Sequence, residues 1–260
     1  MDPDLISAWL REERLAFADF FDQLTPGEWQ RESLCAGWTV HDVLAHITTV
    51  DTLGSTVVGL IRARGNWDRM NAEAARRVSA RHRPDELIER LRASAGSTRR
   101  SPGAAPADPL VDIVVHEQDV ARPLGRTLHT APERVALALD HVLASRFYGA
   151  RKRVRGLRLT ATDADWTYGD GPEQVRAPAI DLLFLATGRG VGRDQPGGGR
   201  AAQRHRGQPP AGAGVIGGGE AGALGGVAGA LVVQGGCAHQ IPVAADLTAR
   251  IQVVSHQFPA

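Results

Sequence analysis

The stretch DPLVDIVVHEQDVARPLG, residues 108–125, combines a long apolar pattern with regularly spaced polar residues. Its valines and isoleucine predict a mostly apolar helix of about 13 residues that stops at the RPLG sequence. Asp112, His116 and Asp119 follow one another at steps of four and three, so on a helix they lie within about 60° of one another. The segment therefore predicts a mostly apolar helix that carries one polar stripe.

The polar stripe has a metal-binding interpretation and a purely structural one. A carboxylate and an imidazole at positions i and i+4 can converge on one metal ion. His46, in the sequence VLAHI, lies on the apolar face of another predicted helix and supplies a third possible ligand. The alternative is that Asp112 and His116 form only a hydrogen bond on the helix surface, and that His46 is a core histidine whose hydrogen bonds are satisfied. The spacing alone leaves both interpretations open.

The sequence on either side predicts a mainly α protein. Helical periodicity extends over residues 3–24 and 39–63, and Thr39 can cap the second helix with Asp42 in its first turn. The sequence APERVALALDHVLASRFYGAR predicts a further helix. After it, GLRLTATDADWTYGDG alternates with a period of two and predicts a hairpin, and APAIDLLFLATGRG predicts a buried helix that ends at Gly188.

Composition limits the class of protein. Hydrophobic residues make up 43% and charged residues 23%, and the formal net charge is +1, so we expect a globular chain that binds neither nucleic acid nor a membrane. Two cysteines, Cys35 and Cys237, can form at most one disulfide, which excludes a disulfide-rich scaffold. Cys35 could be a metal ligand or nucleophile, but a buried structural cysteine is favoured because it has no CxxC partner. With no signal-peptide pattern and no apolar run of about 18 residues, the expected location is cytoplasmic.

The sequence after residue 190 differs in composition from the rest. Residues 191–260 hold about half of the glycines, and glycine at that density makes ordering entropically costly, so we predict a poorly ordered tail. A GC-rich gene that is read in a shifted frame yields an excess of glycine, alanine, arginine and proline. A frame change near residue 190 is therefore one explanation, and a genuine flexible extension is the other.

The block SLCAGWTVHDVLAHI, residues 33–47, resembles the N-terminal block of the mycothiol-dependent maleylpyruvate isomerase family, which has a DinB-like metal-binding bundle. LTPGEW before it, and VVHEQDVARPLG, ADWTYGDGP and DLLFLATGR after it, agree with the resemblance, which extends to about residue 190. The expected organisation is a DinB-like helical bundle over residues 1–150, a small, partial α+β domain over 151–190 and a Gly/Ala-rich tail over 191–260.

The resemblance also implies a site. His46, Asp112 and His116 fall at the positions of the family's metal ligands, although the family commonly has a glutamate where Asp112 stands. It implies a divalent metal, with zinc as the first candidate, and mycothiol, a low-molecular-weight thiol, as co-substrate. Three protein ligands would leave a position on zinc open for water or substrate. Arg122 is a candidate to bind a substrate carboxylate, and Asp119 is a candidate to orient His116.

The resulting functional prediction is a metal- and mycothiol-dependent enzyme, either an isomerase or a thiol S-transferase, that adds or transfers the thiol to a small electrophile. The alternatives are a non-catalytic metal-binding or regulatory DinB-like protein and an inactive, frame-shifted gene product. The sequence assigns no catalytic residue, no particular substrate and no oligomeric state.

Overall fold

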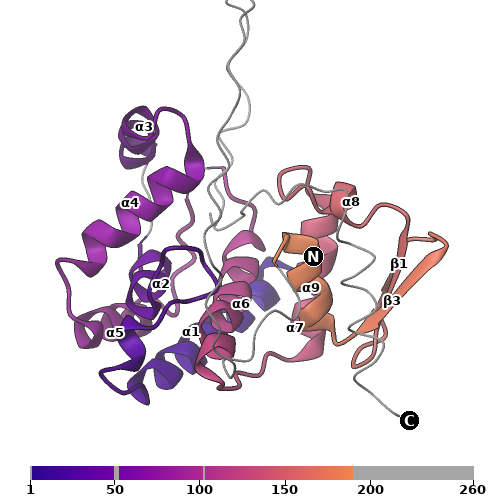
Figure 1. The fold of residues 1–260 in the computed structure, drawn as a ribbon, viewed down its shortest axis with the longest axis horizontal. Helices are drawn as coiled ribbons and strands as arrows, with labels where there is room; N and C mark the ends of the chain where they lie inside the picture. The colour runs from indigo at the N-terminus through magenta and orange to yellow at the C-terminus, as the bar shows by residue number, and fades with distance from the viewer. Residues whose placement is uncertain (1, 50–52, 102, 190–260) are drawn as a thin grey trace, which may run out of the picture.

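The fold is a helical bundle joined to a small sheet, and a computed structural model describes it for residues 2–49, 53–101 and 103–189 (Figure 1). The helices are α1 (Pro3–Asp22), α2 (Val40–Ile47), α3 (Leu53–Arg62), α4 (Trp67–Ser79), α5 (Pro84–Ala93), α6 (Asp108–Ala121), α7 (Pro132–Ala144), α8 (Ala150–Arg153) and α9 (Ala179–Thr187), with short 3₁₀ turns η1 (Glu28–Gln30) and η2 (Arg122–Leu124). The strands are β1 (Leu157–Ala161), β2 (Thr167–Tyr168) and β3 (Glu173–Ala177). The predicted fold class, mainly α with a small α+β part, is confirmed.

Four helices form the bundle that holds the site. Helices α1 and α2 each contact both α5 and α6, so the four close around a common apolar core. Helix α4 packs on α2, and α3 packs on α4 at the edge of the molecule (Figure 1). On the other side of α6, helix α7 contacts both α6 and α9. Helix α6 is therefore enclosed from several sides.

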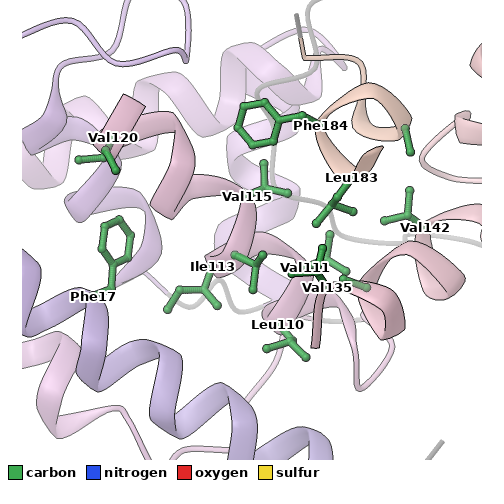
Figure 2. Packing of buried hydrophobic residues seen from close by; sticks show 14 of the residues in the cluster. Phe17, Leu110, Val111, Ile113, Val115, Val120, Val135, Val142, Leu183 and Phe184 are labelled. Atoms are coloured by element: carbon green, nitrogen blue, oxygen red, sulfur yellow. The ribbon is translucent and has the colours of Figure 1, made fainter. Parts of the chain in front are cut away.

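The enclosure of α6 explains its apolar sequence. Every residue from Ile113 to Ala121 is buried, so this part of the helix has no solvent-facing side to fill with charged residues. Figure 2 shows Ile113 on the side of Phe17 from α1, whereas Val115 lies on the side of Leu183 from α9. The polar stripe that the sequence predicts on this helix is thus placed inside the protein, with apolar packing on both flanks.

The helix predicted over residues 39–63 is wrong as one continuous element. Helix α2 ends at Ile47, and α3 begins at Leu53. The hydroxyls of Thr48 and Thr49 both donate to the carbonyl oxygen of Ala45, at 3.0 and 2.8 Å. Such local side-chain bonds, together with the restricted rotamers of β-branched residues, compete with the continuation of a helix.

The small sheet has the strand order β2-β1-β3. Strands β1 and β2 form the antiparallel hairpin that the sequence predicts, with Leu159 opposite Tyr168. The third strand, β3, pairs in parallel with β1 and was not predicted, because only Val175 and Ala177 in it are buried. Helix α9 follows directly, packs on β1 and ends before Gly188, which has a φ of +83°. A left-handed residue at this position ends a helix and favours glycine.

Two predictions from the sequence are not tested by the fold. The predicted glycine-rich tail over residues 191–260 lies outside the described residues. The predicted division of the chain into two domains at residue 150 stays a prediction. Within the described residues, no helix combines the length and the apolar composition that crossing a membrane requires.

Candidate metal centre

Helices α2 and α6 carry the three predicted metal ligands. Asp112 and His116 lie one turn apart on α6, and His46 lies in the last turn of α2. Helix α2 has a capping box, in which Thr39 Oγ1 accepts the backbone N–H of Asp42 at 3.2 Å and Asp42 Oδ2 accepts the backbone N–H of Thr39 at 3.0 Å. Ser79 on α4 donates to the other carboxylate oxygen of Asp42 at 2.6 Å. These bonds fix the start of the helix that presents His46.

The three side chains converge as the spacing indicates. His116 Nε2 lies 3.4 Å from Asp112 Oδ1, and His46 Nε2 lies 3.8 Å from Asp112 Oδ2. The two imidazole rings meet edge to face, with centroids 5.1 Å apart, and one ligand atom from each of the three residues lies within 4.8 Å of the others. Ligand atoms about 2.1 Å from a tetrahedral zinc ion lie about 3.4 Å apart, so the arrangement fits such an ion.

Within the part of the chain that the structure describes, the lack of hydrogen bonds at one nitrogen of each histidine supports this fit. His46 Nε2 and His116 Nε2 are both buried, and neither has a hydrogen-bond partner among the described residues. A buried polar atom without a partner is costly and calls for an explanation, such as coordination to an ion. The alternative interpretation, in which Asp112 and His116 form only a surface hydrogen bond, does not fit because the His116 side chain is 1% exposed.

Asp112 and His116 shift each other's pKa values. Burial alone would raise the pKa of Asp112, but His116 and His46 lower it far below its usual value. Burial alone would lower the pKa of His116, yet the acidic groups near it, Cys35 and Asp112 first, raise it well above its usual value. The site therefore attracts positive charge, which a proton on His116 or a bound cation can supply.

One side of the cluster is closed and the other is accessible. Trp38 is 3% exposed, and its ring lies 5.1 Å from that of His46 and 6.4 Å from that of His116, where it is stacked. The Asp112 side chain is 29% exposed, more than either histidine side chain. A ligand from solution can thus approach on the Asp112 side, whereas Trp38 covers the histidines from within.

Asp119 contacts Nδ1 of His116, the ring nitrogen that does not face Asp112. His116 Nδ1 is 3.0 Å from Asp119 Oδ2, which matches the predicted orienting role of Asp119. Cys35 is buried, as the structural interpretation of this cysteine predicts, and its thiol donates to the same oxygen at 3.3 Å. Burial alone would raise the pKa of Asp119, but Arg189 and His116 lower it to about 2. Asp119 is therefore an anion at neutral pH.

Arg122, the predicted substrate-binding residue, is engaged by other side chains in the structure. Its Nη2 donates to Asp181 of α9 at 2.6 Å, and its Nε donates to Gln118 at 3.2 Å. The guanidinium also lies 4.4 Å from the centre of the Phe184 ring. These contacts tie α6 to α9. A role for Arg122 in binding a substrate carboxylate stays a prediction.

Sequence reasoning did not assign Trp38 and Arg189 to the site. Trp38 stands in the GWTV part of the block that resembles the family, and Arg189 stands in its TGR motif, so both positions belonged to quoted motifs. Their contacts with His46, His116 and Asp119 depend on long-range folding that spacing along the chain does not reveal.

The fold and the site together define a helical-bundle protein with a candidate metal centre of two histidines and one carboxylate. Residues 10–132 match the family model described as the mycothiol maleylpyruvate isomerase N-terminal domain. This match, over somewhat less than half of the 260-residue chain, confirms the resemblance of its sequence motifs to the mycothiol-dependent maleylpyruvate isomerase family.

Comparison with solved structures gives two similar chains. One is a crystal structure of the mycothiol-dependent maleylpyruvate isomerase, with 15% sequence identity and a TM-score of 0.48, over 73% of this chain and 90% of that chain. The other is the crystal structure of a histidine-to-alanine mutant of that isomerase, with 15% identity and a TM-score of 0.47 over the same shares of the two chains. The comparison with curated proteins gave no match.

Proposed function

We propose that this chain is an enzyme that binds one divalent metal ion through His46, Asp112 and His116 and uses mycothiol as its co-substrate. The observation that carries the proposal is that two buried imidazole nitrogens without hydrogen-bond partners face one carboxylate. The family model, whose description names mycothiol and maleylpyruvate isomerase, covers the residues that build this cluster. Zinc is the first candidate because two imidazoles and one carboxylate are a common zinc ligand set.

The chemistry that we propose is thiol addition to a small electrophile. A metal ion bound at this site would supply a Lewis acid that lowers the pKa of a thiol or polarises a carbonyl group. The thiolate sulfur bonds to one carbon of an activated double bond, and the π electrons move to the conjugated carbonyl oxygen. Rotation about the new single bond, followed by cleavage of the carbon–sulfur bond, returns the electrons and releases the thiolate. The substrate is isomerised and the thiol is recovered, so no atom is gained or lost. In the alternative S-transferase reaction, the thiolate displaces a leaving group and its sulfur stays attached to the substrate carbon.

The chain's own residues have distinct parts in this proposal. Asp112 contributes a negative charge on the accessible side, where thiol and electrophile arrive. His116 and Trp38 are buried and form the inner wall of the site, which keeps water from that side. Exclusion of water strengthens electrostatic interactions within a site. We also propose the organisation expected from the sequence, with the bundle over residues 1–150 and the smaller α+β domain over 151–190.

The first test is the metal content of protein that is purified without a histidine tag and supplemented with zinc. We expect one equivalent, and we expect His116→Ala to lose it while the helical circular-dichroism signal survives. His82→Ala is the matched control, because His82 pairs with Glu86 on α5 and has no part in the cluster. Less than about a tenth of an equivalent in the wild-type protein would contradict the metal site.

The second test separates an enzyme from a metal-binding protein. Calorimetry with the zinc-loaded protein should detect binding of mycothiol and weaker binding of glutathione. A screen of small electrophiles with mycothiol should then show turnover that His116→Ala abolishes. If the zinc-loaded protein binds neither thiol, the non-catalytic alternative replaces this proposal.

A further inference from the structure

Asp119 has a buried carboxylate that three segments of the chain hold in place. Its side chain is 0% exposed. His116 of α6 and Cys35, from the loop before α2, both contact Oδ2, at 3.0 and 3.3 Å. Arg189, directly after α9, places its Nε 2.9 Å from Oδ1 and 3.0 Å from Oδ2. A buried anion with donors on both oxygens keeps its charge and has little freedom to move.

The backbone of the same residue fixes the loop that brings Cys35. The carbonyl oxygen of Asp119 accepts the N–H of Leu34 at 2.9 Å, so the residue before Cys35 is attached to α6. Cys35 Sγ consequently lies 3.6 Å from His116 Nδ1, as well as within hydrogen-bonding distance of the Asp119 carboxylate. Asp119 thus holds the loop of Cys35 and the segment of Arg189 close to Nδ1 of His116.

The position of this carboxylate decides which nitrogen of His116 can bind a metal. Asp119 accepts a hydrogen bond from Nδ1, so the proton of a neutral His116 resides on Nδ1 and the lone pair resides on Nε2. Nε2 is the atom that faces Asp112 and has no hydrogen-bond partner among the described residues. A neutral imidazole with its proton on Nε2 could not use that atom as a ligand.

We propose that Asp119 is a positioning residue for the metal centre, and that Arg189 and Cys35 act on the metal through Asp119 by holding its carboxylate against His116 Nδ1. The inference rests on the proposed function, because it concerns the same metal site. It gives Arg189, 70 residues beyond Asp119, an effect on a centre whose ligands all lie on α2 and α6. Outer partners of ligating histidines commonly change metal affinity by about 10- to 100-fold.

The experiment measures the affinity of the full-length protein for Co²⁺, in competition with a chelator, and records the visible spectrum of bound Co²⁺. Asp119→Asn keeps the size of the side chain and removes its charge, so we expect affinity to fall by about 10- to 100-fold with a changed spectrum. Arg189→Met should act in the same direction. Asp181→Asn is the matched control, because it also breaks an aspartate–arginine pair, the one that joins Asp181 of α9 to Arg122 directly after α6, and no interaction that the structure describes joins Asp181 to His116. This control should bind Co²⁺ like the wild type.

A double variant tests whether Arg189 acts through Asp119. If it does, Arg189→Met should cause little further loss in a protein that already carries Asp119→Asn, because the two effects are then not additive. Additive losses would overturn the role given to Arg189. For Cys35, the serine variant keeps a donor and the alanine variant does not, so Cys35→Ser should bind Co²⁺ more tightly than Cys35→Ala.

The possible outcomes separate this inference from the proposed function. If the wild type binds no Co²⁺, the proposed function fails, and the inference fails with it. If the wild type binds Co²⁺, His116→Ala does not, and Asp119→Asn matches the wild type in affinity and spectrum, the inference alone is overturned. If Asp119→Asn does not fold, Arg189→Met and Cys35→Ala decide, and wild-type affinity in both overturns the inference.

Discussion

Replacing Thr39 with alanine should loosen the helix that presents His46. The change removes one bond of the capping box, from the N–H of Asp42 to Thr39 Oγ1 at 3.2 Å, and the side-chain bond from Thr39 Oγ1 to Asp42 Oδ2 at 2.9 Å. Helix α2 has eight residues, fewer than the ~12–15 that an isolated helix needs, so it depends on its cap and its packing. The loss of a threonine cap costs about 0.5–2 kcal/mol. Because Asp42 is only 9% exposed, its freed N–H is poorly hydrated, and we expect about 1–2 kcal/mol.

The assay is urea unfolding followed by circular dichroism, together with thermal unfolding. For a chain of this size, each kcal/mol lowers Tm by about 2–4 °C, so the expected decrease is about 2–8 °C. Thr39→Ser is the control, because serine keeps the hydroxyl and caps helices as well as threonine does. Zinc affinity should fall in Thr39→Ala and remain in Thr39→Ser. If the alanine and serine variants unfold at the same urea concentration, the reasoning about this cap is refuted.

Three further predictions concern protonation and the tail. Zinc affinity should rise with pH while His116 loses its proton, because Cys35 and Asp112 raise the pKa of His116 and zinc must displace that proton. Calorimetry in buffers of different ionisation enthalpy measures how many protons the protein releases when zinc binds, and release of no proton would contradict the prediction. Glu117→Gln should weaken the dependence of stability on pH. Burial and Glu13 raise the pKa of Glu117 in the folded protein, so unfolding releases a proton above about pH 4.5 and the wild type loses stability as pH rises. Urea unfolding at about pH 5 and about pH 7 measures this slope, and a variant with the wild-type slope would disprove it. Limited proteolysis should leave a stable fragment that ends near residue 190, whereas a resistant full-length chain would count against a poorly ordered tail. Resequencing of the gene decides between a frame change and a genuine extension.

The sequence predicted which side chains come together better than it predicted the boundaries of the elements. The stripe on α6 was visible because positions i and i+4 of a helix share one face whatever surrounds them. His46 was visible because α2 begins with a local capping box, and both effects operate over a few residues. The end of α2 was missed because the apolar period continues past Ile47, while the bonds of Thr48 and Thr49 to Ala45 stop the helix.

Contacts between distant segments account for what the sequence could not supply. Arg189 and Asp119 are separated by 70 residues, and nothing in their local patterns links them. Arg122 was chosen because its charge suits a carboxylate, but the carboxylate beside it in the structure belongs to Asp181. A sequence with many arginines offers many such pairings, and only the packing of α9 on α7 and of α7 on α6 selects among them.

The distribution of the proposed metal ligands over two helices has a consequence for engineering. Helix α6 alone fixes the relative positions of Asp112 and His116, since both lie on one rigid, enclosed element. His46 comes from a short helix that is anchored separately by its cap, by Ser79 and by the attachment of Leu34 to α6. A combinatorial library restricted to residues 31–49 could therefore vary the third ligand and its distance while the other two remain in place. Selection from such a library for cobalt, nickel or copper would change metal preference without redesigning the core of the bundle.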